Sequence, residues 1–320
     1  MTDKQDDTVP RPATCRILSL DGGGAKGFYT LGVLREVEGL LGGPLYRHFD
    51  LIFGTSTGSI IASLLALGYE VEAIHKLYCE HVPKVMSKRF AKGRSAALKE
   101  LGDEVYLEKT FEDVKTGLGV VTTKWQIETP MIFKGSVAQA HGRVGTFKPG
   151  FGCTISDAVQ ASCSAYPYFK RQVLHTAMGD QVELVDGGYC ANNPTLYGIA
   201  DAVAALKYEP KDCRVLSIGC GNYPKPKEEW YKRLYRRVLP TLPILDKTMA
   251  INVASMEQLR LILFKDVQTV RINETFERPE MATDLFEHNL KKLNELRQRG
   301  AESFAKREDD IKKLLLSEVN

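Results

Sequence analysis

The chain has 320 residues, of which 43% are hydrophobic and 26% are charged, so it is long enough to bury the core of one large domain. Its 43 basic and 40 acidic residues leave a net charge of only +3, which gives no global field that would indicate nucleic acid as a partner. Seven scattered cysteines without a C-x-x-C pair, and an N-terminus without the apolar stretch of a signal peptide, indicate reduced thiols in a cytosol. The longest apolar run, within residues 60–67, is too short to span a bilayer.

Two strand–turn–helix units open the chain. The apolar segment 16–20 enters the glycine-rich turn DGGGAKG at residues 21–27, and a helical pattern follows it. A second apolar segment at 49–53 enters GTSTG at 54–58, and a nearly all-apolar helix then ends at Gly68. Two such units in succession predict a βαβ arrangement and a parallel sheet.

The rest of the pattern predicts one domain rather than two. Residues 1–14 are polar and contain two prolines, so we expect a disordered arm. No repeat or low-complexity linker divides residues 15–320, and the segments 120–134, 182–185 and 214–218 are typical of strands. We therefore expect a three-layer α/β/α fold with a central, mostly parallel sheet and helical additions at the C-terminus.

The C-terminal part of the chain differs in character. In the basic amphipathic segment 224–264, aromatic residues at helical spacing face away from four cations, which are Lys232, Arg233, Arg236 and Arg237. The pattern fits a membrane-surface helix and a plain solvent-exposed face equally well, and a site for an anionic activator is a third interpretation. Residues 284–320 predict two amphipathic helices separated at Gly300.

Ser56 lies at the centre of a G-x-S-x-G turn between an apolar strand and a helix. Such a turn exposes the serine hydroxyl at the carboxyl edge of the sheet, and Gly54 and Gly58 allow the backbone to make it. The amino end of the following helix also favours the negative charge that a nucleophile develops. The context therefore predicts a nucleophilic serine.

The turn 21–27 admits two interpretations. Its glycines satisfy the G-x-G-x-x-G pattern of dinucleotide sites, but the second strand enters the serine turn instead of ending in the acidic residue that such a site needs. Three consecutive glycines, Gly22, Gly23 and Gly24, beside a nucleophile are better explained as bare N–H donors for an oxyanion. Lys26 either adds positive charge there or pairs with an acidic side chain.

The nucleophile needs a base, and Asp186 is the candidate. It follows an apolar strand and precedes Gly187 and Gly188, which would permit close approach to a serine hydroxyl. The only histidine after it, His288, belongs to a charged amphipathic pattern, which argues against a Ser–His–Asp triad.

Two further groups of residues have plainer explanations. His75 and Cys79 stand four apart on a predicted helix, and without further ligands they are interpreted as core packing, so we expect no metal site. The stretch 192–194, Asn-Asn-Pro, is expected to cap and start a helix rather than to contact substrate.

Together, DGGGAKG (21–27), GTSTG (54–58) and DGGYCANNP (186–194) resemble, in this order, the signature of the patatin-like phospholipases. The resemblance covers residues 15 to about 220 and implies an α/β/α fold that hydrolyses acyl esters of phospholipids without a metal or organic cofactor. It implies Ser56 as the nucleophile, Asp186 as the base and Gly22 to Gly24 as the oxyanion hole. The supporting motif positions are Asp21, Lys26, Gly27, Gly54, Gly58, Gly187 and Gly188.

Segments 16–38 and 140–169 further resemble bacterial anti-phage phospholipases that a cyclic dinucleotide, such as cyclic GMP-AMP, switches on. This implies a cytoplasmic enzyme that acts peripherally on the inner face of the cell membrane, binds no nucleic-acid polymer and can form a homo-oligomer on activation. Arg143, Lys148 and the basic residues at 232–237 are the candidate contacts for the activator. Two alternatives stay open, namely an ungated lipid acyl hydrolase or esterase of the same fold, and a nucleotide-binding protein.

Overall fold

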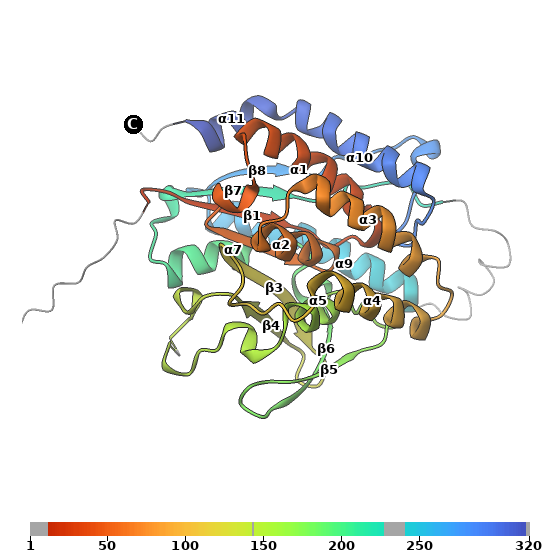
Figure 1. Ribbon diagram of the computed structural model, residues 1–320. Helices are drawn as coiled ribbons and strands as arrows, with labels where there is room; N and C mark the ends of the chain where they lie inside the picture. The colour runs from red at the N-terminus through yellow and green to blue at the C-terminus, as the bar shows by residue number, and fades with distance from the viewer. Residues whose placement is uncertain (1–11, 143, 227–240, 318–320) are drawn as a thin grey trace, which may run out of the picture.

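A computed structural model describes residues 12–142, 144–226 and 241–317 of the chain (Figure 1). Within these ranges eight strands form one sheet, in the order β5-β6-β3-β2-β1-β7-β8 with β4 also paired to β3. The strands are β1 (Cys15–Leu20), β2 (Leu51–Thr55), β3 (Gly117–Lys124), β4 (Thr129–Lys134), β5 (Gln172–His175), β6 (Gln181–Asp186), β7 (Cys213–Ile218) and β8 (Gln268–Ile272). Strands β1, β2, β3, β7 and β8 are parallel, whereas β4 and β6 run antiparallel to β3.

Helices cover both faces of this sheet, as Figure 1 shows. Successive strand residues point to opposite faces, so Leu18 and Ile52 pack beneath α1 and α2, while Ile17 and Phe53 pack beneath α7. The helices are α1 (Gly27–Leu41), α2 (Thr57–Leu67), α3 (Val71–Met86), α4 (Ala91–Tyr106), α5 (Ile155–Ser162), α6 (Gly188–Ala191), α7 (Thr195–Ala200), α9 (Thr241–Leu263), α10 (Leu290–Ala305) and α11 (Glu308–Leu316). The three-layer α/β/α prediction is confirmed.

Strand β3 carries two different strands along the same edge. Its residues 119–124 pair with β4 on one side, so β2 and β6 both occupy the other side. There Thr55, the last residue of β2, is opposite Val121, and Asp186, the last residue of β6, is opposite the next residue, Thr122. The carboxyl ends of β2 and β6 therefore face each other along β3.

One sequence prediction about the elements was confirmed and another was wrong. The strand prediction for residues 120–134 is confirmed, and the segment forms the hairpin β3–β4 with a turn at 125–128. Gly300 lies inside α10 and does not separate two helices; the break comes at 306–307. Glycine is required at 300 because a Cβ atom there would be 2.1 Å from the Tyr29 carbonyl oxygen of α1.

Part of the basic segment 224–264 lies outside the described residues, namely 227–240, which include the four predicted cations. The described part is α9, a long helix that packs on α6, directly after Asp186. The predicted arm is likewise described only from residue 12 onward.

Candidate active site

Ser56 occupies a strained turn between β2 and α2. Its φ of 52° and ψ of −126° lie in a region that non-glycine residues rarely adopt, as expected of a serine presented on a sharp elbow. The turn is held from behind, because the Ser56 N–H donates to Ser162 Oγ at 2.9 Å and Ser162 Oγ donates to the Val121 carbonyl of β3 at 2.6 Å. The hydroxyl is thereby fixed at the carboxyl end of β2.

The two glycines of the elbow are required by close packing. A Cβ atom on Gly54 would be 2.3 Å from the Gly58 carbonyl oxygen, and one on Gly58 would be 2.3 Å from the Leu20 carbonyl oxygen. Both distances are far below van der Waals contact, so the elbow packs against β1 only because these positions have no side chain.

Asp186 ends β6 and is almost completely buried, with 1% of its surface exposed. Burial raises the pKa of its carboxyl group to about 7, and hydrogen bonds from the Gly188 amide, at 2.7 Å, and from the Ser56 side chain offset part of that rise. The residue after it must be glycine, since a Cβ on Gly187 would be 2.2 Å from the Val121 carbonyl oxygen. The structure thus brings Ser56 and Asp186 into contact, and the pKa of the Asp186 carboxyl group lies near neutral pH.

The glycine-rich turn passes beside the nucleophile, but its first amide is not free. The Gly22 N–H donates to the Asn192 carbonyl at 3.0 Å, and Asn192 Nδ2 donates back to the Gly22 carbonyl at 3.1 Å. The prediction that three glycine amides form the hole is therefore corrected for Gly22. The amides of Gly23 and Gly24 make no backbone hydrogen bond within the described ranges and remain candidates for the oxyanion hole.

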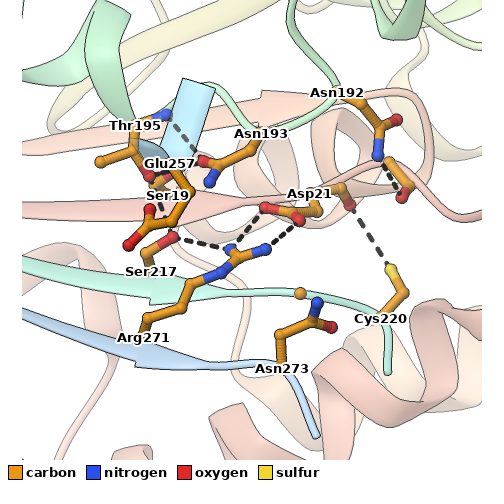
Figure 2. Close-up of polar contacts among 12 residues, drawn as sticks. Ser19, Asp21, Asn192, Asn193, Thr195, Ser217, Cys220, Glu257, Arg271 and Asn273 are labelled. Carbon is orange, nitrogen blue, oxygen red and sulfur yellow. Dashed lines mark hydrogen bonds and ion pairs between the residues drawn. The ribbon is translucent and has the colours of Figure 1, made fainter. Parts of the chain in front are cut away.

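Asp21, at the start of this turn, is a buried anchor. Both of its carboxylate oxygens accept hydrogen bonds from Arg271 of β8, at 2.8 and 2.5 Å, and Arg271 also donates to Ser217 of β7 at 2.7 Å (Figure 2). Thr195 links Ser217 to Asn193, so the network ties β1, β7, β8 and the start of α7 together. A connected network of this kind stiffens the base from which the glycine turn projects.

The stretch 192–194 has two functions rather than the one predicted. Asn193 Oδ1 accepts from the Thr195 N–H at 3.0 Å, so this residue does help to start α7. Asn192 instead clamps Gly22 in the glycine turn. The predicted helix start is observed, with Pro194 as its N-cap, whereas the contact of Asn192 with the glycine turn was not predicted.

Helix α9 is attached to the same region through its inner face. Asn252 Oδ1 accepts from the Asn192 N–H at 3.1 Å, and Asn252 Nδ2 donates to the Cys190 carbonyl at 2.8 Å. Glu257 lies five residues farther along α9, beside the guanidinium of Arg271 (Figure 2). Burial acts to lower the pKa of Arg271, but the carboxylates of Asp21 and then Glu257 outweigh it and raise the pKa.

Sequence reasoning missed Ser162, Arg271 and Asn252 as parts of the site. Ser162 sits in a run of small residues, and Arg271 lies outside the part of the chain that the family resemblance covers, so neither position indicated a partner. Asn252 carried no signal, since nothing local distinguishes an asparagine that bonds to a distant loop.

The other histidines considered from the sequence lie away from Ser56. His288 is exposed in the loop before α10, not in the helix that was predicted, and its ring contacts the Phe286 carbonyl oxygen. His75 Nδ1 lies 3.1 Å from the Arg297 guanidinium, which disfavours a metal there. Across the described residues, the one group of three potential metal ligands within 4.8 Å of each other is Glu80, His81 and Glu104, on α3 and α4.

Comparisons with known proteins agree with this geometry. The patatin-like phospholipase family model matches residues 18–199. The chain is 64% identical over 302 residues to the "cUMP-AMP-activated phospholipase" of Escherichia coli, covering 94% of both chains. It is 32% identical over 220 residues to the "cGAMP-activated phospholipase" of Pseudomonas aeruginosa, covering 64% of this chain and 62% of that protein.

Among solved structures, VipD from Legionella pneumophila aligns with 93% of this chain and 67% of its own length, at 14% identity and a TM-score of 0.49. No helix in the described part of the chain is long and apolar enough to cross a membrane. Because the family model matches more than half of the chain and a relative is 64% identical over 94% of it, the chain belongs to the patatin-like phospholipase family.

Proposed function

We propose that this chain is a phospholipase that hydrolyses acyl ester bonds of membrane glycerophospholipids, with Ser56 as nucleophile and Asp186 as base. The observation that carries the proposal is the contact of a strained, partly buried serine with a buried carboxyl group whose pKa is raised to about 7. Membership of the patatin-like phospholipase family supports the substrate class.

The reaction follows from these positions. Ser56 Oγ attacks the ester carbonyl carbon while Asp186 accepts its proton, and the tetrahedral oxyanion faces the amides of Gly23 and Gly24. The C–O bond to the glycerol backbone breaks, and the lysophospholipid leaves with the proton from Asp186. Water then attacks the acyl-enzyme, gives its proton to Asp186 and releases the fatty acid as Ser56 is restored.

The raised pKa of Asp186 suits this exchange. A base works best when its pKa is near the working pH, because it must both accept and return a proton in each step. An exposed aspartate, which ionises near pH 4, would be a weak base for a serine hydroxyl. Burial of Asp186 therefore contributes to catalysis as well as to packing.

We also propose that a cyclic dinucleotide gates the enzyme. The relative with 64% identity is named for activation by cUMP-AMP, whereas cyclic GMP-AMP, the activator expected from sequence, is named for a relative with 32% identity. The proposal therefore favours cUMP-AMP. A ligand that binds the active state about 10⁴-fold more tightly would convert a nearly inactive population to a nearly active one. A gate is needed in an anti-phage enzyme that attacks its own host's membrane.

The predicted activator contacts can be located only in part. Arg143 and residues 232–237 lie outside the described residues, while Lys148 is exposed in the loop before α5. This loop is held at its base by buried Asp201, which accepts from Lys134 at 2.5 Å and contacts His141 at 2.7 Å. Lys148 remains a proposed contact.

The test is fatty-acid release from phospholipid vesicles by the purified full chain, with cUMP-AMP, with cyclic GMP-AMP and without either. We expect release to be low alone and to rise with cUMP-AMP more than with cyclic GMP-AMP. Full activity without any dinucleotide would refute the gate and leave the phospholipase assignment standing. No release under any condition, from protein that is folded by its thermal melt, would refute the assignment itself.

A further inference from the structure

After Lys247, helix α9 turns its charged residues inward and exposes large apolar side chains. Between Lys247 and Lys265 its only charged residues are Glu257 and Arg260, which pair at 2.7 Å with 24% and 8% of their side chains exposed. The outer face instead exposes five large apolar residues, which are Ile251 (68%), Leu259 (40%), Leu261 (57%), Ile262 (64%) and Leu263 (65%). This is the reverse of an ordinary surface helix.

The inner face of α9 is already used by the active site. Asn252 bonds to the Asn192 and Cys190 backbone, and Met249 Cε lies 3.0 Å from the position of a Cβ on Gly188. Rotation of the helix to bury its apolar side would break these contacts. The apolar outer face is therefore a fixed feature of the surface, and a concentration of exposed large apolar side chains on one helix marks an interface.

A second group of surface residues lies next to α6, the short helix that follows Asp186 and contacts α9. Trp125, just after β3, lies 5.5 Å from the Tyr166 ring and 6.5 Å from the Tyr189 ring of α6, the helix on which α9 packs. Arg171 lies over the Trp125 and Tyr166 rings, at 5.1 and 5.2 Å, and pairs with Glu183. Trp125 and Tyr166 are 37% and 38% exposed. Tryptophan, tyrosine and arginine together are typical of the level of lipid headgroups.

We propose that the outer face of α9, together with the Trp125–Tyr166–Tyr189 cluster, is the surface by which the enzyme rests on a phospholipid bilayer. This inference rests on the proposed function, since it places the site at the membrane that holds its substrate. Charge favours a bilayer over a second protein as the occupant. Exposed Lys247 and Lys265 bracket the apolar face and complement lipid phosphates, while no exposed charge between them would enter hydrocarbon.

The test compares Ile262→Asp and Leu259→Asp with the matched control Leu316→Asp, which changes a leucine of exposure intermediate between theirs (50%) at the end of α11. Binding is measured by flotation with vesicles of phosphatidylethanolamine and phosphatidylglycerol, with cUMP-AMP present throughout. Turnover is measured on the same vesicles and on a soluble short-chain ester. Loss of one buried apolar side chain and gain of a charge should lower flotation, and the ratio of vesicle to soluble-ester turnover, by about tenfold or more.

The control Leu316→Asp should behave as the unchanged chain does. The proposal is overturned if the two α9 variants float and hydrolyse vesicles like the unchanged chain, or if both turnovers fall in equal proportion without loss of flotation. It is also overturned if light scattering shows that they lose a dimer while vesicle binding is kept, because the occupant would then be a second copy. Flotation needs no catalysis, so absence of phospholipase activity in the unchanged chain would refute the proposed function and still leave this surface tested.

Discussion

Ser56 and Asp186 follow and end two strands, β2 and β6, whose carboxyl ends face each other along one edge of β3. Thr55 and Asp186 are opposite the consecutive β3 residues Val121 and Thr122, so the strand pairing sets the separation of the proposed nucleophile and base. A helix follows each residue closely, since α2 starts at Thr57 and α6 starts at Gly188. A two-residue mechanism is possible here because no third side chain is needed to orient a mobile imidazole.

Activity should depend on pH through the base. Because burial raises the pKa of Asp186 to about 7, the carboxylate form required to accept the Ser56 proton becomes dominant only above that pH. We expect kcat/KM on a soluble ester to rise with pH through about 7 and then level off. A profile that is flat from pH 5 to 9 would mean that Asp186 is not the base that titrates.

Stability should show the opposite dependence. The unfolded chain loses the Asp186 proton near pH 3.8 but the folded chain keeps it to about pH 7, so this group's stabilising contribution is present below pH 3.8 and is lost as pH rises to 7. Asp186→Asn removes the buried charge, so its melting temperature should exceed that of the unchanged chain at pH 8, with a smaller difference at pH 5. Equal melting temperatures at pH 8 would contradict the raised pKa.

Gly22→Ala should disable the glycine turn. The added Cβ would be 2.4 Å from Asn192 Oδ1 and 3.1 Å from Ser56 Cβ, so Asn192 would have to release its hold on the Gly22 carbonyl. A displacement of about 1 Å beside the nucleophile is expected to cost about a hundredfold in kcat. The control is Gly39→Ala on α1, where a Cβ meets nothing within 4 Å. Similar kcat values for the two variants would show that the turn is not close to the reaction.

Asn252→Ala should lower turnover without removing any group that touches substrate. It leaves the Asn192 N–H and the Cys190 carbonyl without their partner, which costs about 1–3 kcal/mol and frees the loop that clamps Gly22. We expect kcat on a soluble ester to fall by about tenfold with little change in KM. Ser255→Ala, on the exposed side of the same helix, is the control. If Asn252→Ala lowered only the melting temperature and left kcat unchanged, Asn252 would have a structural role alone.

The sequence was sufficient for the elements that carry local signals. The strand–turn–helix units around Ser56 and the glycines after Asp186 follow from periodicity and turn chemistry, and the structure has them where they were expected. The base was proposed from the strand and glycines around Asp186, from the poor context of His288 and from the resemblance, since no local pattern brings residue 186 to residue 56.

The remaining parts of the site depend on contacts between distant segments. Arg271 meets Asp21 across 250 positions, and Asn252 meets Asn192 across 60, with no periodicity to indicate either. The capture of the Gly22 amide by Asn192 is of the same kind, which is why three free amides were predicted where two remain. Gly300 was misread because the close approach of α1 and α10, like a helix end, favours glycine.

The central claim is that Ser56 and Asp186 act as one unit on phospholipid, and one measurement tests it most directly. Fatty-acid release from phospholipid vesicles in the presence of cUMP-AMP is compared for the unchanged chain, Ser56→Ala, Asp186→Asn, the double variant and His288→Ala. Each single dyad variant should lose activity as completely as the double variant, because losses within one catalytic unit do not add, and His288→Ala should stay active. Asp186→Asn at near-normal turnover, with His288→Ala inactive, would contradict the account.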